Sequence, residues 1–375
     1  KPVRVAVNGV EKIRNRYDEE GKLVESRDAL GNVFRLEYEG ENKPNKLIQP
    51  DGSELRVTYD VRGNITSMID ANGGISKFSY DSLNQVIETI DANGNVTKYE
   101  YDTNGNIIKI INSVGDVRLY KYNEENKVVQ FTDFNGSTIG REYNALNKLS
   151  KVIDQMGRET IFTYDSMWNL ARIVLPDGSK TTYMYNEQNL LGRIRNMNGN
   201  VLRYSYDAVG NCIEAEDEDG NKTHLSYDAL RRLTQVIGPD GTKIFYEYNS
   251  EGKVTKIADS MNHYVGMKYN AGGQLIMEIN QDGESRSYTY TELGKIKSIQ
   301  SETGLKIHYI YGLGGQLKEI VFPDGNKEVY AYDANGNIKE HMDKRGYRVN
   351  YEYNSLNQVI AVSGEDDTTQ QRHNY

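Results

Sequence analysis

Aspartate is the residue type in this chain whose spacing most invites a chemical role. Three Asp-x-Asn-Gly motifs, beginning at Asp70, Asp91 and Asp333, are faintly similar to a calcium-binding loop. A calcium loop needs several oxygen ligands and a later bidentate glutamate, whereas Asp before Asn-Gly is ordinary turn chemistry. Because the 54 acidic residues recur in every turn, no catalytic carboxylate pair stands out. We therefore predict that these aspartates cap turns.

Histidine and cysteine offer no better case for a reactive site. The lone Cys212 excludes an internal disulfide and a thiolate zinc cage, and with no histidine evident nearby we expect a small buried hydrophobic residue there. We accordingly predict no catalytic, cofactor-binding or metal-binding residues, no cofactor and no enzyme activity. The five histidines share no metal-like spacing, and we expect them at the surface: His224, His263, His308, His341 and His373.

Aromatic side chains are the remaining candidates for a binding role. The single tryptophan, Trp168, occupies a turn position, where it either contacts a partner or packs locally, and local packing is the favoured interpretation. Tyrosine supplies 29 aromatic residues, against 7 phenylalanines. Tyrosine stripes can stack on sugar rings, but their period-two placement favours ladders within a sheet.

Composition and charge argue against several classes of protein. The net charge is -9 and the isoelectric point is near 5.3, and no run of Lys or Arg occurs, which argues against a nucleic-acid partner. No apolar stretch approaches the roughly 20 residues of a membrane span. The first ten residues lack the apolar core of a signal peptide.

The elements that position these side chains follow a sequence repeat of constant length. A tyrosine recurs at every twenty-first position from Tyr17 to Tyr353, without insertion or deletion. A fixed period of roughly 20 residues or more is typical of a repeat array rather than of two or three globular domains. We call each of these 17 register tyrosines position 0: Tyr17, Tyr38, Tyr59, Tyr80, Tyr101, Tyr122, Tyr143, Tyr164, Tyr185, Tyr206, Tyr227, Tyr248, Tyr269, Tyr290, Tyr311, Tyr332 and Tyr353.

Two tight turns recur in each repeat. Position +1 is Asp in eight repeats and Asn in six, and position +4 is usually Gly or Asn. Position +14 is Gly in 15 of the 16 complete repeats, and Asn262 takes the remaining place. These residue types predict that an Asx side chain holds the turn while +4 and +14 take left-handed backbone.

Two short strands connect the turns. Position +6 is apolar in nearly all repeats, and +9 and +10 are often both apolar, as in Ile110 and Ile111. Two apolar neighbours break strict alternation, so this strand either carries a bulge or is covered on both faces. From +16 onward the alternation is strict, and +19 is Tyr or Phe in 11 of 16 repeats. This pattern predicts one buried face with aromatic ladders across neighbouring strands.

We predict an all-β repeat protein, in which two-stranded antiparallel units form one continuous spiralling β-sheet that is part of a shell. Short turns force neighbouring strands to run antiparallel, and a wide twisted sheet has to curl. Residues 1–16 are predicted to be a partial repeat and residues 17–359 an array of seventeen tandem repeats. Residues 360–375 are a polar C-terminal tail or the start of the next repeat.

The repeated Tyr-Asp-x-x-Gly-x-Leu, with a following Asp-x-x-Gly and Tyr-x-Tyr-Asp, closely resembles the YD-repeat or RHS-repeat family. The resemblance covers Tyr17 to about Val359. Similar repeats occur in bacterial RHS polymorphic toxins, wall-associated contact toxins, the C components of insecticidal toxin complexes, and teneurins. In that family the repeats form a spiral β-sheet cocoon, which encapsulates a C-terminal toxin or, in teneurins, supports cell–cell adhesion. Toxin members carry an Asp-Pro-rich segment that often cleaves itself, and this chain contains no Asp-Pro pair.

The resemblance implies a structural shell segment of a secreted or surface-delivered bacterial toxin. Its expected partners are a C-terminal toxin cargo that is not present in this chain and the flanking repeats of the same full-length protein. The alternative is a cell-surface adhesion or carbohydrate-binding repeat protein, whose partner is a surface glycan or a receptor. Under either interpretation the expected location is secreted or cell surface, with no membrane span.

Overall fold

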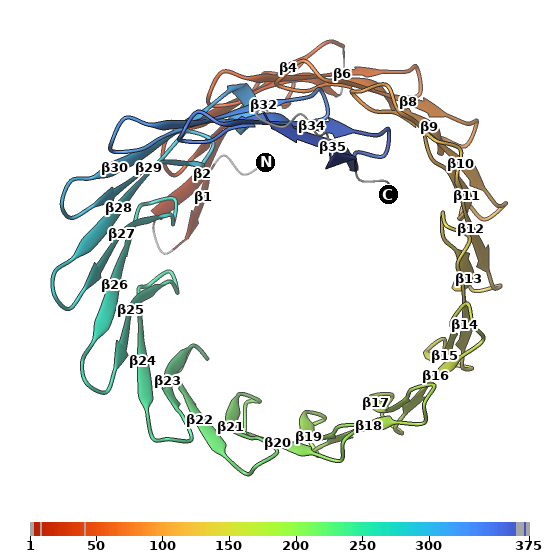
Figure 1. Ribbon diagram of the computed structural model, residues 1–375, viewed down its shortest axis with the longest axis vertical. Coiled ribbons are helices and arrows are strands. Elements are labelled where there is room, and N and C mark those ends of the chain that lie inside the picture. The colour runs from red at the N-terminus through yellow and green to blue at the C-terminus, as the bar shows by residue number, and fades with distance from the viewer. Residues whose placement is uncertain (1–3, 8–9, 41–42, 365–370, 373–375) are drawn as a thin grey trace. The chain divides into compact units, whose positions relative to one another are not determined.

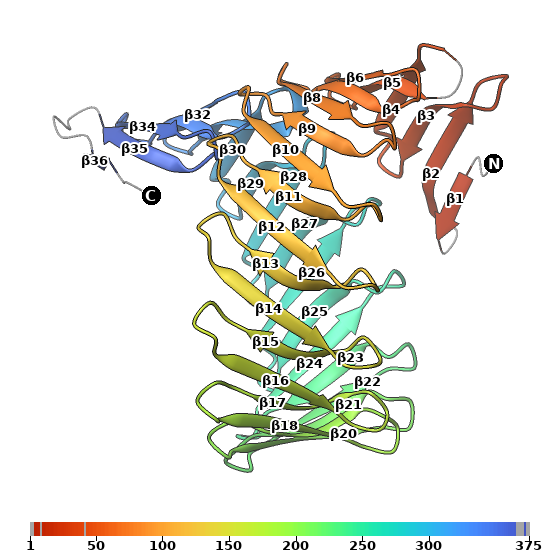
Figure 2. The same cartoon turned by 90° about the vertical axis from the view of Figure 1, so that its right-hand side faces the viewer.

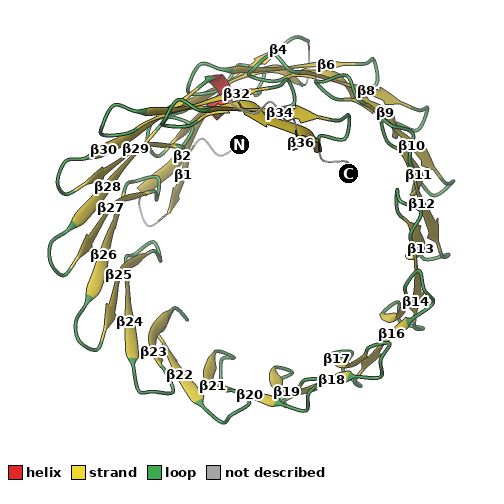
Figure 3. Ribbon diagram, in the orientation of Figure 1, coloured by secondary structure: helices red, strands yellow, loops and turns green. Residues whose placement is uncertain are grey.

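A computed structural model of the chain describes residues 4–7, 10–40, 43–364 and 371–372. These residues form strands and tight turns, with a single 3-10 turn, η1 (Leu313–Gly315), among them (Figure 3). All 36 strands belong to one sheet, and every described pairing is antiparallel, as in the pairing of β14 with β15. The predicted all-β fold of antiparallel two-stranded units in a continuous sheet is therefore confirmed.

The strands follow one another along the chain (Figure 2), and two kinds of strand alternate in its sequence. From β2 to β34 the even-numbered strands end on a register tyrosine: β2 (Val10–Tyr17), β4 (Val33–Tyr38), β6 (Glu54–Tyr59), β8 (Ile75–Tyr80), β10 (Val96–Tyr101), β12 (Val117–Tyr122), β14 (Thr138–Tyr143), β16 (Glu159–Tyr164), β18 (Lys180–Tyr185), β20 (Val201–Tyr206), β22 (Lys222–Tyr227), β24 (Lys243–Tyr248), β26 (Tyr264–Tyr269), β28 (Ser285–Tyr290), β30 (Lys306–Tyr311), β32 (Lys327–Tyr332) and β34 (Arg348–Tyr353).

The odd-numbered strands carry positions +6 and +9, which are mostly apolar: β3 (Leu23–Asp28), β5 (Pro44–Ile48), β7 (Ile65–Ile69), β9 (Val86–Ile90), β11 (Ile107–Ile111), β13 (Val128–Thr132), β15 (Leu149–Ile153), β17 (Leu170–Val174), β19 (Leu191–Arg195), β21 (Cys212–Glu216), β23 (Leu233–Ile237), β25 (Val254–Asp259), β27 (Leu275–Asn280), β29 (Ile296–Ser301), β31 (Leu317–Val321), β33 (Ile338–Met342) and β35 (Val359–Gly364). Two further short strands are β1 (Arg4–Val7) and β36 (Gln371–Arg372). The remaining residues of the predicted tail, 365–370 and 373–375, lie outside the described part of the chain.

The chain forms two compact units. Unit 1 comprises residues 1–100, 111–116 and 267–375, and unit 2 comprises residues 101–110 and 117–266. In unit 2 each strand from β12 onward pairs with the next one along the chain, as far as β26. In unit 1 the same consecutive pairing runs from β1 to β10 and from β27 to β36.

A β-bulge recurs in fifteen described pairings of a tyrosine strand with the strand that follows it. In one of them Tyr206 pairs with Cys212 while Ser205 pairs with Glu214, so that Ile213 is the extra residue. The bulge decides between the two alternatives left open by the paired apolar residues. It places +6 and +9 on the tyrosine face and +8 and +10 on the opposite face, because successive side chains alternate once the extra residue has been inserted.

The register tyrosines are held by their hydroxyl groups. In fourteen repeats the hydroxyl donates to the backbone carbonyl of position +6 in the preceding repeat, at oxygen–oxygen distances of 2.5 to 3.1 Å. Each tyrosine thus ties the end of its own strand to the bulge of the preceding repeat. This recurring bond explains why tyrosine, rather than phenylalanine, occupies position 0.

The predicted aromatic ladders are wrong for most of the sheet. The aromatic contacts among the described residues are Tyr120 with Tyr122 and with Phe131, and Tyr330 with His341. Each tyrosine strand lies between two aliphatic strands, so position +19 faces the aliphatic +9, as Tyr183 faces Ile194. Tyrosines of successive repeats are therefore two strand spacings apart, about 9.6 Å, which is too far for regular stacking.

The sheet has little enclosed core. Among the described residues the buried apolar side chain is Ala361, and most of the others are half-buried or exposed. Stability must therefore come from cross-strand pairs, the tyrosine bonds and the turns, each of which is small and repeated many times.

Tyr206→Phe is expected to lower the free energy of unfolding by about 1 kcal/mol, because the hydrogen bond to the Leu191 carbonyl is lost. Burial raises the pKa of Tyr206, as expected for a hydroxyl held away from water. Tyr204→Phe is the matched control, since Tyr204 lies on the same strand with no described hydroxyl bond. Urea unfolding measures both variants, and equal losses would show that the hydroxyl bond is not the cause.

Candidate functional site

The Asx side chains close the turns by accepting bonds from the backbone ahead. Asp102 Oδ1 accepts the N–H groups of Asn104 and Asn106, and Asp102 Oδ2 accepts the side-chain amide of Asn106, all at 2.9 Å. The Asn106 amide and the backbone N–H groups favour the ionised carboxylate and lower the pKa of Asp102. The predicted turn-capping role is confirmed.

Left-handed backbone occurs at +4 and +14, as predicted, and it includes Asn262 with φ of 66°. At +4 two repeats depart from Gly or Asn: Trp168 has φ of 65° and Arg231 has φ of 63°. A bulky side chain in this region is strained because its Cβ approaches the backbone. The turn geometry therefore persists even where the residue type opposes it, and the Trp168 side chain remains 46% exposed.

Trp168→Asn is expected to raise the free energy of unfolding by about 1 kcal/mol, because asparagine adopts left-handed backbone more readily than tryptophan. Trp168→Ala is the control, since alanine retains most of the strain and should gain less. Thermal unfolding compares the two variants. A loss of stability in the asparagine variant would mean that local packing of the indole outweighs the backbone strain.

In unit 1, turns of early repeats contact turns of late repeats, and the strands coloured orange and blue lie side by side there (Figure 1). We call this set of contacts the turn seam. It consists of the second turns at residues 28–32, 49–53, 70–74, 91–95 and 112–116, and the first turns at residues 270–274, 291–295, 312–316, 333–337 and 354–358.

The centre of the turn seam is a reciprocal clasp between two identical pentapeptides, Asp-Ala-Asn-Gly-Asn, at residues 91–95 and 333–337. Asn93 Nδ2 donates to Asp333 Oδ2 at 3.0 Å, and Asn335 Nδ2 donates to Asp91 Oδ2 at 2.8 Å. The Asn93 N–H also donates to Asn335 Oδ1 at 3.0 Å. Two of the three motifs that were faintly similar to a calcium loop thus bind each other.

One separation along the chain recurs in the turn seam. Ser113 Oγ donates to the Ser355 carbonyl across the same separation of 242 residues that joins Asn93 to Asn335. This separation corresponds to about eleven and a half repeats, so each of these two contacts joins a second turn to a first turn. Because first and second turns alternate along the chain, second turns of early repeats contact first turns of late repeats.

Small residues and buried polar groups mark the closest contacts of the turn seam. A Cβ on Gly314 would lie 2.5 Å from Cβ of Ala71, so this position requires glycine. The Gly314 N–H donates to Asp51 Oδ2 at 3.1 Å. Ser53 is 1% exposed and Asn112 is 7% exposed. Burial this complete is rare in the sheet, which indicates a packed contact rather than a loose one.

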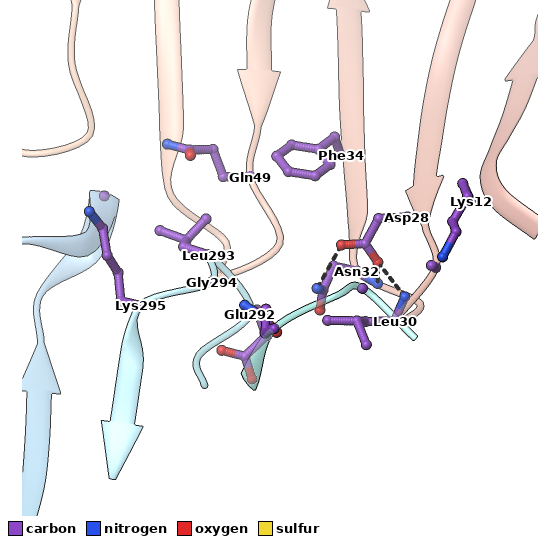
Figure 4. A pocket seen from close by; sticks show the side chains of 14 residues that line it. Lys12, Asp28, Leu30, Asn32, Phe34, Gln49, Glu292, Leu293, Gly294 and Lys295 are labelled. Atoms are coloured by element: carbon purple, nitrogen blue, oxygen red, sulfur yellow. Dashed lines mark hydrogen bonds between the residues drawn. The ribbon is translucent and has the colours of Figure 1, made fainter. Parts of the chain in front are cut away.

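A groove of about 620 Å³ lies at one end of the turn seam (Figure 4). Lys12, Leu30, Phe34, Glu292 and Lys295 contribute to its lining. Asp28 also lines it, but its carboxylate is occupied by the backbone of Leu30 and by the backbone and side chain of Asn32. The groove holds no nucleophile paired with a base, so its geometry fits a space between packed turns.

The residues singled out for metal or acid–base chemistry do not come together. No group of three or more His, Cys, Asp or Glu side chains in the described ranges could hold a metal ion. His224, His263 and His308 are exposed, as expected. His341 is half-buried, contrary to expectation, because position +9 lies on the tyrosine face. Its imidazole ring stacks on the ring of Tyr330, with the two ring centroids 4.7 Å apart.

Tyr330 and Cys212 are two groups with a raised pKa, and the other histidine, His373, lies outside the described residues. The hydroxyl of Tyr330 donates to Glu328, and burial together with that carboxylate raises its pKa to about 12. Burial likewise raises the pKa of Cys212, whose thiol contacts the Glu214 carbonyl at 3.5 Å. A raised thiol pKa disfavours the thiolate, which supports a packing role.

A search for membrane helices among the described residues finds none that is long and apolar enough to cross a bilayer.

A single antiparallel sheet of short tandem repeats, with turns that contact one another, defines an all-β repeat protein. The model of the teneurin YD-shell family matches residues 70–245 and 224–342. The chain therefore belongs to the teneurin YD-shell family, and the resemblance to YD repeats is confirmed. No curated protein matches the chain.

Solved structures agree with this assignment at the level of the fold. The chain is similar to the crystal structure of TcdB2-TccC3, with 13% identity, a TM-score of 0.82, and coverage of 97% of this chain and 24% of that one. For TcdB2-TccC3 without its hypervariable C-terminal region the identity is 12%, the TM-score is 0.70, and the coverage is 98% and 26%. For the Photorhabdus luminescens Tc holotoxin pore the identity is 15% and the TM-score is 0.56, and the match covers 93% of this chain and 24% of that one. The chain spans about a quarter of the length of these solved chains.

Proposed function

We propose that the chain is a shell segment of a secreted or surface-delivered bacterial toxin, and that the shell confines a C-terminal toxic domain outside this chain. The turn seam is the observation that carries this proposal, since a sheet only one layer thick can act as a wall where neighbouring turns seal against each other. One matched structure lacks a hypervariable C-terminal region that its full protein carries. A hypervariable region at the C-terminus of a structure that shares this fold supports a cargo at the equivalent place in the full-length protein.

The role is mechanical rather than catalytic. The teneurin YD-shell family and the all-β fold support a structural role. The cargo and the flanking repeats of the same protein are the proposed partners. The proposed location is secreted or cell surface.

Protease protection of the C-terminal region in the full-length protein tests confinement. In the unaltered protein that region is expected to resist a protease that digests it when it is expressed alone. Asn93→Ala with Asn335→Ala removes the clasp and should speed its digestion. Asn198→Ala is the matched control, because Asn198 occupies the same position +13 as Asn93 and its described hydrogen bond stays within its own turn.

Two results would contradict confinement. One is a C-terminal region digested equally fast with and without the shell. The other is a full-length protein that has no domain-sized region beyond the repeats.

Adhesion or carbohydrate binding is the second candidate function, and the exposed Trp168 favours it. A partly exposed indole on a strained turn next to Met167, which is 67% exposed, is suited to stacking on a sugar ring. Trp168→Asn keeps the backbone of the turn while removing the ring. Glycan-array binding that is lost in this variant would support adhesion, and no binding by the unaltered chain would remove the case for it.

A further inference from the structure

Charged residues at position +8 commonly form ion pairs across the strands. This position lies on the face opposite the register tyrosines, and its neighbours across the strands are +16, +18 and +20 of flanking strands. Eight charged residues at +8 form ion pairs with these neighbours: Glu25, Lys46, Glu88, Lys151, Glu214, Lys256, Glu319 and Glu340. A ninth charged residue at this position, Lys109, also has an interaction partner.

Arg172 and Arg193, in two consecutive repeats of unit 2, depart from this rule. Neither has an ion-pair or hydrogen-bond partner for its side chain among the described residues. Arg193 lies opposite Met184 on one side and opposite Arg203 on the other. Like charges directly opposite each other destabilise a sheet, and the carboxylate of Glu216 pairs with Arg203 instead.

Two more unpaired cations share this face. Arg195 lies opposite Thr182, which in turn lies opposite Arg172. Lys180 belongs to the same strand and face as Thr182, and neither Lys180 nor Arg195 has a described side-chain partner. Four cations on three adjacent strands thus lack counter-charges among the described residues, in a chain whose net charge is -9.

Three of these cations line a concavity of about 580 Å³. Lys180, Arg193 and Arg195 share its lining with Met184 and Met197, and the two methionines are 54% and 53% exposed. The Nε atom of Arg193 is buried without a hydrogen-bond partner. A buried donor without a partner is costly, so the chain itself does not satisfy the guanidinium group of Arg193.

We propose that this concavity binds an extended, acidic polypeptide segment. Its carboxylates bond to the guanidinium groups of Arg193 and Arg195, and its apolar side chains pack on the two methionines. Residues two apart in one strand are about 6.7 Å apart, which is also the spacing of alternate side chains in an extended peptide. Arginine binds carboxylates in a bidentate manner, and methionine adapts to varied apolar partners. The lining contains no aromatic ring on which a nucleotide base could stack.

The test measures binding of a fluorescent eight-residue peptide of alternating Glu and Leu to the full chain by anisotropy. Binding is expected to weaken at least tenfold when Gln replaces Glu in the peptide, and at least tenfold in Arg193→Gln with Arg195→Gln. Lys151→Gln is the matched control, because Lys151 occupies the same position +8 but pairs with Glu159 at 3.1 Å. Its affinity for the peptide should be unchanged.

Arg193→Glu separates a binding role from a structural one. A glutamate there would face Arg203 and restore the pairing seen elsewhere at +8, so the variant should unfold at a higher temperature while losing the peptide. An unchanged or lower unfolding temperature would overturn the proposal. So would failure of the unaltered chain to bind the Glu peptide, or tighter binding of a single-stranded thymidine oligonucleotide than of that peptide.

Discussion

Replacing Asp91 with alanine is expected to lower the free energy of unfolding of unit 1 by about 3 kcal/mol, from the loss of several bonds to a charged acceptor. The Asp91 carboxylate accepts the N–H groups of Asn93 and Asn95 at 3.0 and 2.8 Å, and the side-chain amide of Asn95 at 2.9 Å. It also accepts the Asn335 amide across the turn seam at 2.8 Å. The variant therefore opens a turn and half of the clasp together.

Asp217→Ala isolates the part of that loss that belongs to the turn seam. Asp217 occupies the same position +11 and accepts the equivalent bonds from Asp219 and Asn221. Among the described residues it accepts no bond from a distant repeat, so its replacement should cost about 2 kcal/mol. Urea unfolding measures the totals, and amide exchange in β9 and β33 locates the change. Equal losses in the two variants would show that the bond across the turn seam adds nothing.

Acid is expected to destabilise the whole array, because turn aspartates are ionised in the folded protein. Burial alone would raise the pKa of Asp91 and of Asp333, but their hydrogen bonds outweigh it and both pKa values are lowered. Thirteen other turn aspartates have a lowered pKa for related reasons: Asp51, Asp60, Asp81, Asp102, Asp133, Asp154, Asp165, Asp177, Asp207, Asp217, Asp228, Asp240 and Asp259.

The sign of this pH dependence follows from proton uptake. An aspartate whose folded pKa lies below its unfolded value of about 4 stabilises the fold fully above about pH 5, and the contribution is lost as pH falls through the folded pKa. The urea midpoint should therefore fall steadily between pH 5 and pH 3. A midpoint that stays constant over this range would contradict the ionised turns.

Asp91→Asn with Asp333→Asn tests the source of the acid sensitivity. Asparagine keeps the backbone bonds of the turn, as Asn144 does with Leu146 and Lys148, but it does not titrate. The double variant should take up as many as two fewer protons on unfolding, so the slope of stability against pH should decrease. An unchanged slope would place the acid sensitivity elsewhere in the chain.

The local structure could be predicted because its causes lie within a few residues. Asx at +1 and Gly at +14 predicted turns that the structure confirms, since the bonds that close each turn span only two to four residues. Alternation from +16 onward predicted the tyrosine strands for the same reason. The bulge was left open, because an apolar pair such as Ile110 and Ile111 fits a bulge and a doubly covered strand equally well.

Contacts beyond the immediate neighbours were harder to predict. The aromatic ladders failed because adjacent strands carry different positions of the repeat, so that Tyr183 meets Ile194 rather than another tyrosine. The tyrosine hydroxyl bond had a signal that could have revealed it, namely the preference for tyrosine over phenylalanine at position 0. The unpaired Arg172 and Arg193 gave no signal, since only the cross-strand register shows which charges lack partners.

The sequence by itself determined the repeat, the two turns, the strand order and the family, because a period that never changes along the chain constrains every neighbour pair in the same way. Only the tertiary structure decided which distant turns meet. The contact between Asn93 and Asn335 spans 242 residues. The same residue types recur in turns such as the one at Asp217, which make no such contact among the described residues, so the sequence of a single repeat does not encode it.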